Sequence, residues 1–124
     1  MVFRVSIGES VAVYFKEGDK TVKEYRARGG NAEVIKEFMR NLLTSSNAKI
    51  VVKNKALEVY EVEGPLAAKA TLIVVSAARL RSKQSLKKVC ETIVKMDDNE
   101  AMEWADKLKK YGLKVGSALR ELYK

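Results

Sequence analysis

Two segments at the start of the chain alternate apolar residues with tyrosines and lysines, a pattern typical of β-strands with two different faces. They cover residues 11–16 and 21–27. If Gly18 and Asp19 form a two-residue turn between them, Ala12 lies opposite Tyr25 and Phe15 lies opposite Val22. One face of this predicted hairpin is then aliphatic, and the other carries Tyr14, Lys16, Lys23 and Tyr25.

A second predicted hairpin has the same two-faced pattern. Its strands cover residues 48–53 and 56–62 and turn at Asn54 and Lys55. In that register Val52 lies opposite Leu57, and Ile50 lies opposite Val59. The other face then holds Lys49, Val51, Lys53, Glu58 and Tyr60.

Rings and ammonium groups on one open sheet face could bind a single-stranded nucleic acid. Aromatic rings stack on bases at about 1–3 kcal/mol each, and lysines contact phosphates and release counterions. The simpler alternative is an ordinary solvated surface, because tyrosine is a good strand residue and lysine is common on exposed sheets.

A run of basic residues without acids lies in the second half of the chain. No Asp or Glu occurs between Glu63 and Glu91, and Arg79, Arg81 and Lys83 surround a predicted helix start, where backbone N–H groups also attract phosphate. Arg26 and Arg28 are further candidate phosphate ligands. Alternatively, the run answers the acidic segment 97–106 within the fold or in a second subunit.

Composition restricts the chemistry. The 124 residues carry a formal charge of +8 and include no histidine and one cysteine, so we expect no metal site, no disulfide and no cofactor. Without a histidine base or a nucleophile motif we expect no enzyme. A magnesium-dependent nuclease using Asp97, Asp98 and Glu100 is the catalytic alternative, although these residues also suit a helix N-terminus. No segment resembles a signal peptide or a membrane span, which predicts a cytoplasmic location.

The periodicity predicts one α+β domain over residues 1–124. An antiparallel sheet of four to five strands and one helix occupy residues 1–63, and a helical half follows in residues 65–124. A strand at 2–7 precedes the first hairpin, and a helix capped by Asn31 runs to residue 43. Residues 66–81 fit a helix better than a buried strand, and further helices are expected at 82–96 and from 97 or 98 onward.

The final segment, after Gly112, has Val115, Leu119 and Leu122 at helical spacing, and we expect these residues to form a homo-oligomer interface. The order of hairpin, helix, hairpin and helical half on a basic chain resembles the ThermoDBP-like single-stranded DNA-binding proteins of thermophilic archaea. It is also similar to the small subunit of archaeal CRISPR interference complexes. The first resemblance implies sequence-tolerant binding of single strands by an oligomer that is not an OB-fold.

The leading hypothesis from the sequence is therefore a nucleic-acid-binding protein that prefers single-stranded DNA or RNA. The alternative is a scaffold subunit of a larger complex, held through its charged helices and its last amphipathic segment.

Overall fold

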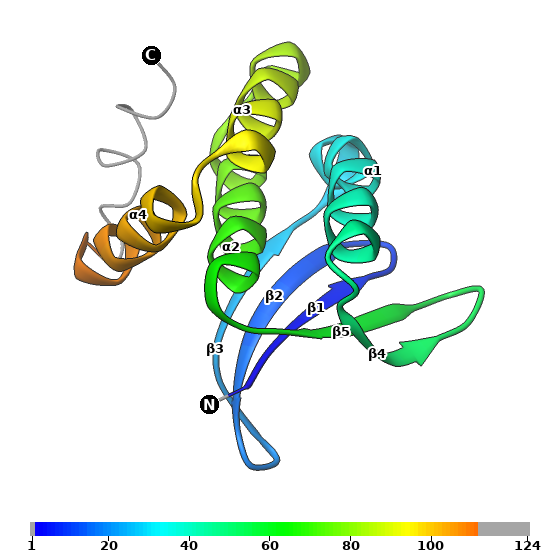
Figure 1. Ribbon diagram of the computed structural model, residues 1–124. Coiled ribbons are helices and arrows are strands. Elements are labelled where there is room, and N and C mark those ends of the chain that lie inside the picture. Colours follow the sequence, from blue (N-terminus) through cyan, green and yellow to red (C-terminus); the bar gives the residue numbers. More distant parts are fainter. Residues whose placement is uncertain (1, 112–124) are drawn as a thin grey trace.

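The structure, a computed structural model, describes residues 2–111. It consists of an antiparallel sheet with helices covering one of its faces (Figure 1). The strands are β1 (Val2–Ile7), β2 (Val11–Glu17), β3 (Lys20–Ala27), β4 (Lys49–Lys53) and β5 (Glu58–Val62). They lie in the order β3-β2-β1-β5-β4, so β1 joins the two hairpins at the centre of the sheet. The predicted α+β class and both hairpins are confirmed.

Four helices lie in the described residues: α1 (Gly29–Ser45), α2 (Gly64–Arg79), α3 (Lys83–Lys95) and α4 (Asp98–Tyr111). Helices α1 and α2 pack on the sheet, α3 packs on α1 and α2, and α4 packs beside α2. The predicted final helix and its interface residues Val115, Leu119 and Leu122 lie outside the described residues.

Of the segment 66–81, residues 66–79 belong to a helix, α2, as the periodicity predicts, and the last two residues lie in the link to α3. The segment looks like a strand in sequence because α2 is buried along Thr71–Ala77 without a polar stripe. Neighbours surround this helix: the sheet, α1, α3 and α4 all contact it. A helix with apolar residues on every side is stable only in such a position.

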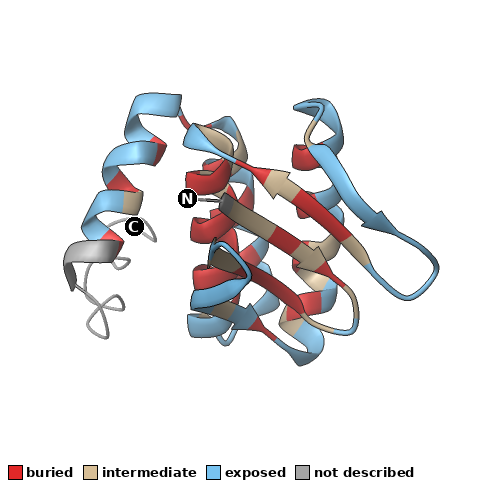
Figure 2. Cartoon of the chain, turned by 90° about the horizontal axis from the view of Figure 1, so that it is seen from below, coloured by how far each residue is buried: buried red, intermediate tan, exposed pale blue. Residues whose placement is uncertain are grey.

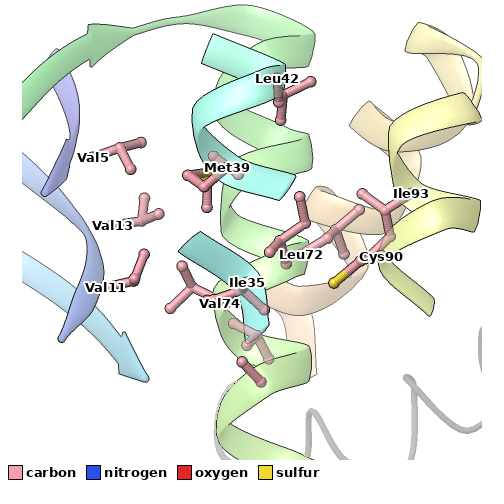
Figure 3. Packing of buried hydrophobic residues seen from close by; sticks show 14 of the residues in the cluster. Val5, Val11, Val13, Ile35, Met39, Leu42, Leu72, Val74, Cys90 and Ile93 are labelled. Carbon is pink, nitrogen blue, oxygen red and sulfur yellow. The ribbon is translucent and has the colours of Figure 1, made fainter. Parts of the chain in front are cut away.

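The core consists of two apolar layers. Val5, Val11 and Val13 of the sheet face Ile35 and Met39 of α1, and all five side chains are at most 2% exposed (Figure 3). On the side of α2 that faces away from the sheet, Leu72 of α2 packs with Cys90 and Ile93 of α3. Buried positions appear red along α2 and the central strands in Figure 2.

Candidate nucleic-acid interface

The first hairpin turns at Gly18 and Asp19 as predicted, with Glu17 paired to Lys20 and Gly18 at φ 60°. A β-bulge then adds one residue to β3, because Lys16 pairs with Thr21 while Phe15 pairs with Lys23. Beyond the bulge every pair is shifted by one residue, and such a shift moves each side chain to the opposite face.

Tyr25 consequently lies opposite Val13 and not opposite Ala12, so the prediction that Tyr25 and Lys23 belong to the open face is wrong. Both residues line an apolar groove of about 390 Å³ between the sheet, α2 and α4. The Lys23 ammonium lies 5.2 Å from the centroid of the Tyr25 ring. Phe15 and Val22 line the same groove.

The second hairpin departs from its predicted register for two reasons. Its loop has four residues, because β4 ends at Lys53 and β5 begins at Glu58. Asn54 closes this loop: its N–H donates to the Leu57 carbonyl, and its side-chain oxygen accepts from two backbone N–H groups. A second bulge, at Val51, then leaves Ile50 opposite Tyr60.

Tyr60 pairs with Val5 of β1 and so faces the helices, and the prediction that its ring is open to bases is wrong. Its side chain is 2% exposed, and its hydroxyl donates to the Glu58 carboxylate at 3.0 Å. Burial raises the pKa of Tyr60, and the Arg40 guanidinium, 2.8 Å from Glu58, holds the pKa of that carboxyl below its usual value. Lys53 pairs with Glu58 and so shares the helix-facing side.

The open face retains part of the predicted composition. Tyr14, Lys16 and Lys49 lie on it, with Arg4 opposite both Tyr14 and Glu61 at the centre. Arg26 also lies there, but its guanidinium bonds the Glu24 carboxylate and the Ser10 hydroxyl. Arg4 was not among the predicted site residues, although the alternation of β1 is a sequence signal that places it on this face.

A second group of cations meets at one end of the molecule. We define the basic patch as Arg28, Arg79, Arg81 and Lys83. Arg28 precedes the first turn of α1, Arg79 ends α2, Arg81 lies in the link to α3, and Lys83 begins α3.

Asn31 holds these segments together. Its side-chain amide donates to the carbonyls of Ala77 and Leu80 at 2.9 and 2.6 Å, tying the start of α1 to the end of α2. The prediction that Asn31 caps α1 is wrong: Arg28 is the N-cap residue, without a side-chain cap bond, and Asn31 lies within the helix. Its amide instead satisfies two carbonyls at a helix C-terminus, where intrahelical partners are lacking.

Lys83 packs against the start of α1. A Cβ atom added to Gly30 would lie 3.1 Å from the Cε and 3.3 Å from the Nζ of Lys83, so the glycine leaves room for the lysine side chain. The position is electrostatically unusual, because a helix N-terminus carries a partial positive charge and favours an anion. Neither α1 nor α3 has an acid in its first turn, whereas α4 begins with Asp98 and Glu100.

The basic patch is not neutralised within residues 2–111. Ion pairs in this part of the chain join Arg26 to Glu24, Lys36 to Glu33, Arg40 to Glu58 and Lys69 to Asp98, and none includes a patch residue. Within the described residues, the basic run meets the acidic segment only at Lys69, whose Nζ lies 3.7 Å from Asp98. The patch is thus a site where positive charge accumulates and where an anion would reduce repulsion.

Other chemistry finds little support in the part of the chain that the structure describes. Within it, His, Cys, Asp and Glu side chains form no group of three that could hold a metal ion. One oxygen of Asp97 accepts from the Asn99 N–H at 2.7 Å, which is a helix-capping contact. Burial raises the pKa of the Cys90 thiol to about 12, and no helix over residues 2–111 is long and apolar enough to cross a bilayer.

Comparison with protein-family models, with curated proteins and with solved structures finds no match to this chain. The resemblance in layout to the ThermoDBP-like proteins therefore stays a prediction.

Proposed function

We propose that the chain binds nucleic acid, single-stranded DNA or RNA, by contacting backbone phosphates with the basic patch. The observation that carries this proposal is the meeting of four cations and two helix N-termini, with no ion pair to a described residue. Guanidinium groups and backbone N–H groups both bind phosphate oxygens, and neither reads base identity there. Binding is therefore tolerant of sequence.

The preference for single strands rests on one ring. Tyr14 is half-buried on the open face, and no helix covers that face in the described residues. Arg28 follows β3 directly and Tyr14 lies in the middle of β2, on the order of 10–15 Å away by the rise of a strand. A strand whose phosphates contact the patch can reach this ring with a base. Tyr25 and Tyr60 have no part in the proposal, because one lines the groove and the other is in the core.

Salt dependence tests the phosphate contacts. Each neutralised phosphate contributes about −0.7 to the slope of log K against log salt for a single strand, so four patch cations predict a slope of about −3. The R79Q/R81Q/K83Q protein removes three of these charges and should reduce that slope by about 2. Fluorescence anisotropy with a labelled oligonucleotide of about 20 nucleotides, at about 50 and 200 mM NaCl, measures both slopes.

A matched control separates the site from the total charge. The K20Q/K55Q/K95Q protein loses the same three charges from exposed positions outside the patch. It should keep most of the wild-type affinity, whereas the patch variant loses at least about tenfold. Equal loss in both proteins, or no binding by the wild type at the lower salt, contradicts the proposal. The Tyr14→Ala protein tests the role of the ring, because it should lose the preference for single-stranded over double-stranded oligonucleotides.

A further inference from the structure

The β4–β5 hairpin exposes apolar side chains that the proposed nucleic-acid site does not use. Among the described residues the large apolar side chains that are most exposed form two groups. Val22 and Met102 belong to the groove beside α4, and the hairpin carries the rest: Ile50, Val51, Val52 and Leu57. Ile50 is 51% exposed. Exposed apolar residues gathered in one place mark an interaction surface.

Strand β4 also has a free edge, meaning that no strand within residues 2–111 pairs with its outer side. It is the last strand in the order β3-β2-β1-β5-β4, and all five of its residues are exposed, so it is coloured pale blue along its length in Figure 2. A terminal strand presents unpaired N–H and C=O groups to any chain that can add a further strand.

Charge determines which chain can pair with the free edge of β4. Lys49 and Lys53 are at the two ends of β4, and neither forms an ion pair with a residue in 2–111. A second copy pairing antiparallel about Val51 would bring the Lys49 end of each strand beside the Lys53 end of the other, and a parallel copy would place each lysine beside its equivalent. Either arrangement gathers four lysines along one seam with no acid beside them among the described residues of β4, and neighbouring like charges are destabilising, so β4 repels its own copy.

The strand already paired to β4 shows the pattern that suits it. On the inner edge, Glu61 of β5 lies opposite Lys49 and Glu58 lies opposite Lys53, with Val59 and Tyr60 between them. Acids flanking apolar residues thus match both lysines in one register. The same lysines border the free edge, where no described residue supplies the acids.

We propose that the free edge of β4 binds an extended acidic segment of another protein, which adds to the sheet as a sixth strand. The segment carries carboxylates three or four residues apart, opposite Lys49 and Lys53, and apolar residues between them. Backbone hydrogen bonds supply affinity, and the two lysines select acidic over basic partners.

This surface is separate from the basic patch. The patch lies at the N-terminal end of α1, while β4 follows the C-terminal end, and a helix of 17 residues is about 25 Å long. That distance exceeds the screening length of about 8 Å at physiological salt, so each surface can be altered without a large electrostatic effect on the other. The two proposals can therefore fail independently.

A synthetic peptide with the sequence of residues 58–63, EVYEVE, with blocked ends and a fluorescent label, is the probe. It should bind the wild-type chain in anisotropy titrations, and the matched peptide KVYKVK should bind at least about tenfold more weakly. In the K49E/K53E protein the preference should reverse, with KVYKVK the tighter ligand. The R79Q/R81Q/K83Q protein should bind EVYEVE as the wild type does.

Backbone pairing has its own signature. Two further forms of EVYEVE carry N-methyl groups on every second amide, one form in each phase. Because an added strand uses only one of its edges, one form should lose binding and the other should keep it. The proposal is overturned if both forms bind equally, if the wild type does not distinguish EVYEVE from KVYKVK, or if no saturable binding occurs up to about 1 mM. A wild-type dimer in sedimentation velocity that K49E/K53E dissociates would also overturn it, since a second copy would then occupy the edge.

Discussion

Asn31 is the residue whose removal tests how the basic patch is assembled. Its side-chain amide makes two hydrogen bonds, to the carbonyls of Ala77 and Leu80. A hydrogen bond of this kind contributes about 0.5–1.5 kcal/mol net, so Asn31→Ala should lower the free energy of unfolding by about 1–3 kcal/mol. With a urea m-value of about 2 kcal/mol/M, the midpoint of unfolding falls by about 0.5–1.5 M.

The control is Asn41→Ala, at an exposed position of the same helix whose side chain makes no hydrogen bond to a described residue. Asn41→Ala changes only the helix propensity, and alanine there should raise the free energy of unfolding by a few tenths of a kcal/mol, roughly. Urea titrations followed by circular dichroism and by the fluorescence of the buried Trp104 measure both variants. If Asn31→Ala lowers stability by less than about 0.5 kcal/mol relative to Asn41→Ala, the two hydrogen bonds do not hold the junction together.

The Asn31→Ala protein keeps every charge of the patch. Its oligonucleotide affinity should nonetheless fall, because the links that hold Arg28 close to Arg79 and Arg81 are lost. Unchanged affinity in a folded Asn31→Ala protein would show that the net charge of the region matters and that its arrangement does not.

Three further predictions follow from the core and from Glu58. Leu72→Ala should cost about 2–5 kcal/mol in urea unfolding, since the side chain is fully buried between helices; a loss under about 1 kcal/mol would contradict this packing. Cys90, whose thiol pKa is raised to about 12, should react with iodoacetamide at mildly alkaline pH only as fast as the protein unfolds; equal labelling of native and urea-unfolded chains would refute its burial. The Arg40 hydrogen bond lowers the pKa of Glu58 from the ordinary value of 4.5. The ionised Glu58 carboxylate therefore stabilises the folded protein above pH 4.5, and this stabilisation is lost as pH falls through the folded-state pKa. Glu58→Gln should therefore weaken the acid dependence of the urea midpoint, and an unchanged dependence would contradict the linkage.

Element types were predictable from the sequence, because they depend on local periodicity. The stripe of Ile35, Met39 and Leu42 at helical spacing defines α1, and alternation defines the strands. Gly18 marks the first hairpin turn correctly. These features need no knowledge of what packs against them.

The faces of the strands were not predictable, since one added residue reverses them. The bulge between the pairs Lys16–Thr21 and Phe15–Lys23 has no clear sequence signal, and it transfers Tyr25 to the groove. The loop closed by Asn54 is two residues longer than the turn predicted there. Tyr60, an acceptable surface residue in sequence, pairs with Val5 on the helix-facing side of β1 and belongs to the core.

The charged residues of the basic patch were predictable from the sequence, but their assembly at one position in the fold was not. The run without acids identifies Arg79, Arg81 and Lys83, and Arg28 stands out before two glycines. Their meeting depends on Asn31 reaching 46 and 49 residues along the chain, a tertiary contact that no local pattern encodes.

The position of α4 has a consequence for how the molecule opens. This helix packs chiefly on α2, while α2 also holds the sheet, α1 and α3. Amide protons of α4 should therefore exchange with solvent through a partial opening that leaves the rest of the domain closed, at lower free energy than those of α2. Such an opening would widen the apolar groove beside the sheet, so molecules too large for the closed cavity would enter it at a rate set by this one helix.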